Sequence, residues 1–395
     1  MLYSLITKCR GCHASAERLE KVLSMEPMPL AGMFCSSEEE ARTAPIFPLT
    51  WVFCQQCGLV QVKENVSDEY LFSKYNYSSS TVGGLVRHFV GYADFLKSRY
   101  GEAAGVKFLE IGCNDGVLLK RLPTVWNLIG CDPSDVAATA ARDQSYRLLE
   151  KPFNLQTVSG EKLDAGIDVI SGSNCLAHIS DLKEVFEAAW RALRPGGHIW
   201  IEVHDLGALL RGGQWDTIYH EHKVEWSEDS LKNCLGRIGF VHRETIHIPM
   251  HGGALRICFE KGPAQQASDT QTLHPPKELA DLRKAYESRY ETEAARELKE
   301  IAARGGKIAA YGAAGRANVY LNQTRELRFD YIVDESPLRL HKFIPQTTTP
   351  IVPPSALAEK PVDACLITAW NYRDDIIRKN PQHHGKWLTA FQDPE

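Results

Sequence analysis

The sequence predicts an α/β protein in which a cysteine-rich N-terminal segment precedes two successive strand–helix units. Three observations lead to this fold class. Two Cys-x-x-Cys pairs, Cys9–Cys12 and Cys54–Cys57, stand near the start of the chain. Further along, the apolar runs Val106–Ile111 and Lys307–Tyr311 each end in a glycine-containing turn. Strands that alternate with helices after such turns are typical of a parallel sheet covered on both faces.

Length and composition exclude several classes of protein. The chain has 395 residues and a formal net charge of −5, which suits two or three domains and gives no support to a nucleic-acid binder. The N-terminus lacks the basic and apolar regions of a signal peptide. No apolar run approaches the roughly 20 residues that span a bilayer. We therefore expect a cytoplasmic protein, monomeric or a small homo-oligomer, without nucleic-acid or membrane partners.

Changes in composition divide the chain into three expected domains. Residues 1–65 hold both cysteine pairs and show little helical periodicity. Residues 66–262 begin with a bridge that leads into an amphipathic helix, and then alternate strands and helices. A polar segment over Gln265–Pro276 is typical of a linker. Residues 277–395 open with one long charged helix over Lys277–Ala303 and continue as a second α/β domain.

The individual elements follow from hydrophobic periodicity and from helix stop signals. Apolar residues at helical spacing predict helices around Leu85–Leu96 and over Leu182–Leu193, and the second ends at Arg194-Pro195-Gly196-Gly197. Strands are expected at Val106–Ile111, Trp126–Cys131, Ile167–Ser171, Ile199–Val203, Lys307–Tyr311, Phe329–Val333 and Ala364–Thr368.

The two cysteine pairs predict a structural zinc site. Two knuckles about 40 residues apart present four thiolates to one ion, and the second is followed by a glycine. Four cysteines fill every position of a tetrahedral site, so none is left for water or substrate. The zinc ligands are therefore expected to be Cys9, Cys12, Cys54 and Cys57. The alternative is four unlinked buried cysteines, and His13 and Cys35 are weaker candidates for ligands.

The first glycine turn and the acid after the second strand predict a nucleotide-type cofactor. Glycines at Gly112 and Gly116 let the backbone approach a ligand, and Asp132 can accept hydrogen bonds from ribose hydroxyls. A dinucleotide remains an alternative, but Glu110 would repel its pyrophosphate. The acid suits the methionine end and sulfonium of S-adenosylmethionine. We therefore predict a Rossmann-like class I methyltransferase domain. The candidate cofactor-binding residues are Glu110, Gly112, Asn114, Gly116, Asp132 and Asn174.

Two polar segments are candidates for the catalytic cluster. Asn174-Cys175-Leu176-Ala177-His178 follows a strand at the carboxyl end of the sheet, where ligands bind in such folds. The second segment, Tyr219–His222 (Tyr-His-Glu-His), is four polar, titratable residues in a row, which does not suit a buried strand or helix. On a loop at the rim of the sheet, its side chains could supply a base, an orienting carboxylate and a phenol.

The whole chain resembles the sugar C-methyltransferases of deoxysugar biosynthesis, which add a methyl group at C3 of nucleotide-linked keto sugars. The resemblance covers the double Cys-x-x-Cys and the motifs at Tyr75–Ser80, Glu110–Gly116, Asn174–His178, Tyr219–His222, His251–Arg256 and Tyr311–Arg316. It implies a Rossmann-like C-terminal domain that helps to hold a nucleotide-diphosphate keto sugar. Members of the family commonly carry Tyr-Gly-Ala-x-Ala-Lys-Gly where this chain has Tyr311–Ala317, so one glycine is displaced and the cation is Arg316.

The resemblance also implies roles for single residues. His222 would be the base that removes the C3 proton, Glu221 would orient a histidine or polarise the site, and Tyr219 and His178 would donate toward the enolate oxygen or hold the sugar. Tyr75 and Tyr77 would cover the sugar or the cofactor, and Arg316 would bind phosphate. His220 would point away if the segment is extended. Methylating carbon requires an enolate, which a C4 ketone makes accessible.

Two other functional classes stay open at the level of sequence. An N- or O-methyltransferase acting on a sugar nucleotide would need no enolate and would accept substrates without the C4 ketone. A non-enzymatic zinc-ribbon adaptor would bind no cofactor. The intact Glu110, Gly112, Gly116 and Asp132 argue against the adaptor.

Overall fold

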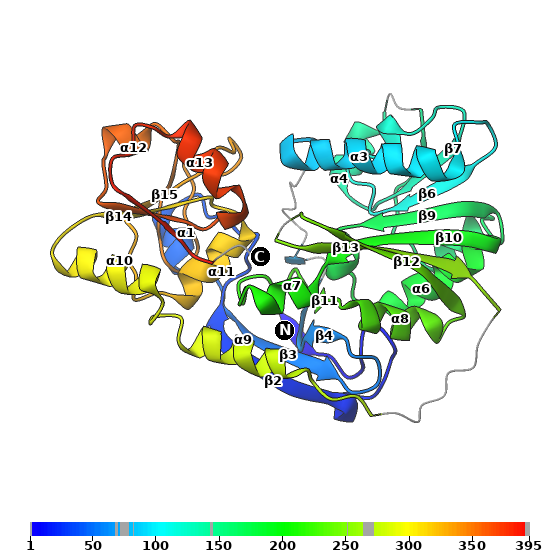
Figure 1. Ribbon diagram of the computed structural model, residues 1–395, viewed down its shortest axis with the longest axis horizontal. Helices are drawn as coiled ribbons and strands as arrows, with labels where there is room; N and C mark the ends of the chain where they lie inside the picture. The colour runs from blue at the N-terminus through cyan, green and yellow to red at the C-terminus, as the bar shows by residue number, and fades with distance from the viewer. Residues whose placement is uncertain are drawn as a thin grey trace.

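The computed structural model describes residues 2–67, 70–71, 79–81, 83–142, 145–250, 252–263 and 272–391. Three larger sheets organise these residues, and Figure 1 shows them as a lower N-terminal layer, a central sheet on the right and a C-terminal unit on the left. Tyr75, Tyr77, His251 and most of the expected linker lie outside the described residues.

The N-terminal part is an antiparallel β-structure closed by a later strand. Its four-stranded sheet has the order β11-β4-β3-β2, and a smaller sheet pairs β1 with β5. The helix α1 begins after Ser37, whose side chain accepts a hydrogen bond from the Glu40 amide. The elements are β1 (Tyr3–Leu5), η1 (Ala16–Arg18), β2 (Leu19–Met28), α1 (Glu38–Arg42), β3 (Phe47–Cys54), β4 (Val60–Val62), β5 (Glu64–Val66) and β11 (Val224–Glu225).

The central sheet has seven strands in the order β12-β13-β10-β9-β6-β7-β8. All its neighbours pair in parallel except β13, which is antiparallel to both β10 and β12. The strands are β6 (Lys107–Ile111), β7 (Asn127–Cys131), β8 (Arg147–Leu149), β9 (Ile167–Ser173), β10 (Leu193–His204), β12 (Phe240–Ile248) and β13 (Ala254–Lys261). The helices are η2 (Ser79–Thr81), α3 (Gly83–Tyr100), η3 (Leu119–Arg121), α4 (Asp135–Ala140), α5 (Leu155–Gly160), η4 (Leu176–His178), α6 (Leu182–Ala192), α7 (Leu206–Arg211) and α8 (Glu228–Gly236).

Alternating residues of this sheet pack on opposite faces, as parallel strands covered on both sides require. Phe108 and Val169 pack with the buried stripe of α3, whereas Leu109 and Ile170 pack with α5, α6 and α8. Figure 1 shows α3 on one side of the sheet and α6 and α8 on the other. The predicted strands in this region and the helix around Leu85–Leu96 are thus confirmed.

The long helix expected over Lys277–Ala303 is wrong in one respect, because it is two helices. α9 (Lys277–Glu287) ends before Ser288, and α10 (Glu293–Ala303) begins after Thr292, whose hydroxyl accepts a hydrogen bond from the Ala295 amide. This N-cap satisfies an amide that a continuous helix would bond to a preceding carbonyl. Within one hydrophobic cluster, α9 contacts α7 and β2, whereas α10 contacts β14 and β17.

The C-terminal unit is a five-stranded parallel sheet with the order β16-β15-β14-β17-β18. Chain reversal at the central strand β14 gives the doubly wound arrangement of Rossmann-like folds. Its three predicted strands are confirmed. The elements are β14 (Ile308–Tyr311), α11 (Gly315–Gln323), β15 (Tyr331–Val333), β16 (Ile351–Val352), α12 (Ala356–Glu359), β17 (Ala364–Ile367), η5 (Trp370–Tyr372), α13 (Arg373–Lys379) and β18 (Lys386–Thr389).

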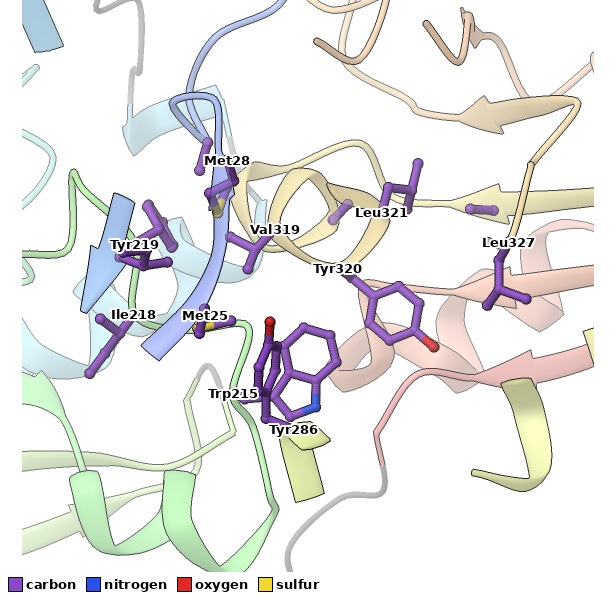
Figure 2. Packing of buried hydrophobic residues seen from close by; sticks show 14 of the residues in the cluster. Met25, Met28, Trp215, Ile218, Tyr219, Tyr286, Val319, Tyr320, Leu321 and Leu327 are labelled. Carbon is purple, nitrogen blue, oxygen red and sulfur yellow. The ribbon is translucent and has the colours of Figure 1, made fainter. Parts of the chain in front are cut away.

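One hydrophobic cluster joins the N-terminal sheet, the central unit and the C-terminal unit. Figure 2 shows Met25 of β2, Trp215, Tyr286 of α9 and Tyr320 of α11 gathered together. The rings of Trp215 and Tyr320 stack with centroids 5.4 Å apart. Because side chains from all three parts share this core, the loop that follows Trp215 is held between them. That loop contains the predicted Tyr-His-Glu-His segment.

Candidate active site

The four predicted zinc ligands come together. The Sγ atoms of Cys9 and Cys57 lie 3.7 Å apart, as do those of Cys12 and Cys54, and all four lie within 4.8 Å of one another. A tetrahedron with Zn–S bonds of about 2.3 Å has edges of about 3.8 Å, so the spacing fits a zinc ion. The Gln61 amide donates to the Cys9 sulfur at 3.2 Å, which stabilises a thiolate. These residues would hold the ion in a closed structural site.

The weaker ligand candidates have other partners. The Nε2 atom of His13 lies 2.7 Å from the Asp181 carboxylate, and Cys35 pairs through its backbone with Phe343. A fifth thiol, Cys234 of α8, is buried in the same cluster as Cys9, Cys54 and Cys57. Nothing in the sequence marks Cys234, because it is distant along the chain and stands outside any Cys-x-x-Cys pair.

The predicted cofactor loop follows β6 and is shaped for close packing. Gly112 has φ of +66°, and a Cβ atom there would lie 2.5 Å from the Cβ atom of Cys175. Gly116 has φ of +71°, and a Cβ atom there would meet the Tyr146 hydroxyl at 2.5 Å. The two turns therefore require glycine for both conformation and space. They place the loop against the segment that follows β9.

Buried polar atoms beside this loop have no partner among the described residues. They include Oε2 of Glu110, Oγ of Ser173, and both amide atoms of Asn174. Asn174 also adopts a left-handed φ of +56°. Such groups are costly in a protein interior unless a ligand satisfies them. They lie at the ends of β6 and β9, where an α/β sheet binds ligands, so these residues fit a polar cofactor such as S-adenosylmethionine.

Acidic side chains concentrate at the same edge of the sheet. Burial, together with the nearby Asp132, Asp115 and Glu202 carboxylates, raises the pKa of Glu110 well above its usual value. The Asp132 carboxylate accepts hydrogen bonds from the Asn114 amide at 2.8 Å and from the Ser134 amide at 2.9 Å. An acidic edge favours a cationic sulfonium and ammonium over a pyrophosphate.

We expect Asp132→Ala to weaken S-adenosylmethionine binding by about 1–3 kcal/mol, since ribose hydroxyls and two loop amides lose their acceptor. Titration calorimetry measures this change directly. Asp135→Ala, at an exposed position three residues further on, is the matched control and should leave affinity unchanged. An Asp132 variant with wild-type affinity would remove this residue from the cofactor site.

The Tyr-His-Glu-His segment forms a turn, and the ring of His222, its last residue, contacts the rings of Tyr219, His178 and His204. The Nδ1–H group of His222 donates to the Thr217 carbonyl at 3.0 Å, because a carbonyl oxygen can only accept. Its Nε2 atom therefore carries the lone pair and accepts from the Tyr219 hydroxyl at 2.9 Å. Desolvation, and next the neighbouring His178, lower the pKa of His222 well below its usual value. His222 is thus a neutral imidazole with a directed lone pair.

His178 joins this cluster from the other predicted segment. Its ring centroid lies 5.1 Å from that of His222, and its Nδ1 atom donates to the backbone carbonyl of Glu221 at 2.7 Å. The Glu221 carboxylate points elsewhere and accepts from the Gly32 amide at 2.7 Å. The backbone of Glu221, and not its carboxylate, thus orients His178.

Sequence reasoning missed His204 and Glu225 beside His222. His204 ends β10, and its ring centroid lies 5.5 Å from that of His222. Glu225 stands in β11 and is 1% exposed, and burial raises its pKa to about 8. His220, in contrast, faces the N-terminal sheet and donates to the Pro48 carbonyl at 2.9 Å. His204 could have been found from the sequence, because it directly follows the predicted strand Ile199–Val203.

Arg316 reaches the same region from the start of α11. Its guanidinium pairs with the buried Asp216 carboxylate, with Nη2 and Nε at 2.6 and 3.0 Å from the two oxygens. It also lies 5.0 Å from the ring centroid of Trp370. The C-terminal unit is therefore joined by an ion pair to the loop that carries Tyr219 and His222.

The described helices include none that is long and apolar enough to cross a membrane.

Comparison with known proteins agrees with this arrangement. Family models match three successive segments: a zinc binding domain over residues 9–72, a methyltransferase domain over residues 87–245, and a C-methyltransferase C-terminal domain over residues 249–391. The C-methyltransferase NovU of Streptomyces niveus is 27% identical over 98% of this chain and 96% of its own length.

Other similar proteins match a smaller share of the chain. A ubiquinone biosynthesis O-methyltransferase of Cupriavidus pinatubonensis is 30% identical over 25% of this chain and 42% of its own length. Among solved structures, the PH0226 protein from Pyrococcus horikoshii OT3 has 17% identity and a TM-score of 0.39, covering 49% of this chain and 99% of that chain. The three matched domains and the full-length relative leave the non-enzymatic adaptor without support. The chain is therefore an S-adenosylmethionine-dependent methyltransferase, similar over nearly its whole length to a C-methyltransferase and, in its first part, to a zinc binding domain.

Proposed function

We propose that this enzyme methylates C3 of a nucleotide-linked 4-keto deoxysugar in the cytoplasm, through an enolate formed by His222. The observation that carries the proposal is the imidazole of His222, fixed by Thr217 with its Nε2 lone pair directed at the Tyr219 hydroxyl. A neutral, oriented base is what proton abstraction next to a ketone needs. The full-length match to a C-methyltransferase supports carbon as the acceptor atom.

In the proposed enolate formation, His222 removes the proton and Tyr219 stabilises the oxygen. The C3 proton of the bound sugar passes to Nε2 of His222, and the electrons of the C–H bond move toward the C4 oxygen. When the sugar binds, the Tyr219 hydroxyl turns from Nε2 of His222 to the C4 oxygen, which frees the lone pair for the proton and lets the hydroxyl donate to the enolate oxygen as it forms. When bound, S-adenosylmethionine supplies the electrophilic methyl group. The proton on His222 then leaves to solvent, which restores the base.

His178 is assigned to the sugar. Because its Nδ1–H group donates to the Glu221 carbonyl, Nε2 is the ring nitrogen assigned to a sugar hydroxyl. Tyr75 and Tyr77 retain their proposed role in covering the ligands. Glu221 supports the site by holding Gly32 of the N-terminal part close to the loop.

The proposal is tested by incubating the protein with labelled S-adenosylmethionine and a panel of 4-keto sugar nucleotides. Product mass and carbon NMR should locate the new methyl on C3. Matched 4-hydroxy sugar nucleotides are the control and should not react. Methylation of those controls on oxygen or nitrogen would replace the proposal with an O- or N-methyltransferase.

We further propose that Arg316 contacts the pyrophosphate of the sugar nucleotide through the edge of its guanidinium that Asp216 does not occupy. Its place at the N-terminus of α11 favours an anion. Arg316→Ala should raise the apparent KM for the sugar nucleotide by roughly 10- to 100-fold, the equivalent of about 1.5–3 kcal/mol for a charged hydrogen bond. Steady-state kinetics should show unchanged affinity for S-adenosylmethionine.

Arg316→Ala alone would leave the buried Asp216 unpaired, which is destabilising. The double variant Arg316→Ala/Asp216→Asn removes that charge and should restore stability without restoring KM. Arg378→Ala, whose guanidinium is largely exposed on α13, controls for loss of a positive charge. Equal weakening of both substrates would place Arg316 outside the nucleotide-sugar site.

A further inference from the structure

Three potential metal ligands meet beside the catalytic loop, well separated in the chain from the cysteine cluster. They are His204 at the end of β10, His222 in the loop and Glu225 in β11. Their ligand atoms all lie within 4.8 Å of one another. Two imidazoles and one carboxylate are a common donor set for divalent first-row transition metals, which leaves positions open for water.

One oxygen of the buried Glu225 carboxylate lacks a hydrogen-bond partner among the described residues. Its side chain is 1% exposed, and Oε1 accepts no hydrogen bond from any described residue. The charged groups that face it are Arg316 and Asp205, and Arg316 is itself paired with Asp216. A buried carboxyl without a donor costs free energy. A cation held by Glu225 and the two imidazoles would remove that cost.

His222 is already oriented as metal-bound histidines are. Such histidines donate their second ring N–H group to a carboxylate or a backbone carbonyl, which fixes the other nitrogen toward the ion. The Nδ1–H group of His222 donates to the Thr217 carbonyl at 3.0 Å and leaves Nε2 as the ligand atom. The Tyr219 hydroxyl that now occupies this lone pair would yield its place to the metal.

We propose that His204, His222 and Glu225 form a second, inhibitory metal site for one divalent first-row transition-metal ion such as cobalt or nickel. Binding forms bonds from two imidazole nitrogens and one carboxylate oxygen, and any proton on Glu225 is released to water. The ion holds the Nε2 lone pair that proton abstraction requires. Inhibition therefore rests on the proposed function, whereas metal binding does not. The four-cysteine site keeps its zinc when cobalt or nickel is added, because thiolate ligands favour zinc.

The experiment uses the zinc-loaded enzyme and cobalt chloride. After dialysis against a weak chelator, cobalt should bind with one added equivalent per chain and give a visible absorption band. Methyl transfer should fall at least tenfold along the same titration. A brief excess of EDTA should remove the band and restore the rate, with the original zinc content retained.

Two variants test the ligands. His204→Asn and Glu225→Gln should lose the cobalt band, and the rate that each variant has without cobalt should stay constant along the titration. His242→Asn, at a histidine of β12 that hydrogen-bonds Thr245, is the matched control and should behave like the wild type.

The outcomes separate the two proposals. An unchanged cobalt band in His204→Asn and Glu225→Gln overturns the site, as does activation of the wild type by cobalt. A band that both variants lose, with no inhibition of the wild type, leaves the site standing. That last result would overturn the inhibitory role and the assignment of His222 as the base.

Discussion

Replacing His222 by alanine is expected to lower the rate of methyl transfer by about 100- to 10,000-fold, the usual worth of a positioned base. Both ligands should still bind, because the change removes a lone pair and leaves the backbone of the loop in place. In heavy water, the wild type should exchange the C3 hydrogen of the sugar for deuterium, and the variant should not. Proton NMR of the recovered sugar nucleotide measures this exchange.

Neighbouring histidines provide the controls for this result. His220→Asn changes a ring that faces the N-terminal sheet, and it should retain exchange. His178→Ala should retain part of the exchange, since its proposed task is to hold the sugar. If His222→Ala exchanges at the wild-type rate and His178→Ala abolishes exchange, the two histidines trade roles. If neither change affects exchange, the enolate mechanism is wrong.

Removal of zinc is expected to unfold the N-terminal sheet. Structural zinc binds small domains with about 10–16 kcal/mol, which is comparable to the total stability of a domain, about 5–15 kcal/mol. Because four thiolates close the coordination sphere, the metal has no position for a substrate. Stripping the zinc should therefore lower Tm and abolish activity together.

Elemental analysis should find one zinc per chain after dialysis, and Cys9→Ser or Cys54→Ser should lose it. Cys365→Ser, at a buried thiol of the C-terminal sheet, is a control that should keep the zinc. Thermal unfolding followed by circular dichroism checks the structural effect. A zinc-free preparation that keeps the wild-type Tm and recovers turnover only with zinc would contradict a purely structural role.

Much of the fold could be predicted because its signals are local. The strands around Glu110 and Tyr311 are short apolar runs, and each is followed by a glycine, Gly112 or Gly312. Both glycines have a positive φ and too little space for a side chain. The zinc ligands were predictable because each pair occupies one turn, and the thiol chemistry restricts what four such residues can do. His178 and His222 were each placed at the rim of the sheet by the strand before them.

The remainder depends on contacts between distant parts of the chain. The pairing of Arg316 with Asp216 joins residues 100 positions apart, and the bond from Glu221 to Gly32 spans 189. Neither has a sequence signal, since an isolated aspartate or glutamate in a loop is usually solvated. Glu225 was missed because it lies in a two-residue strand, which pairs with β4 at the edge of the sheet among the described residues. The break between α9 and α10 was missed because its apolar stripe continues across Thr292.

The strand β11 has a consequence for how this enzyme can be divided or recombined. Val224 and Glu225 pair with Gln61 and Val60, so the segment just after His222 is the edge strand of the zinc-bearing sheet. Excising residues 1–66 would expose that segment as an unpaired edge and release the loop before it. A chimera between two such enzymes should therefore exchange residues 1–66 together with residues 217–226. The strands of this sheet come from two segments that are distant in the sequence, so both segments must come from the same parent enzyme.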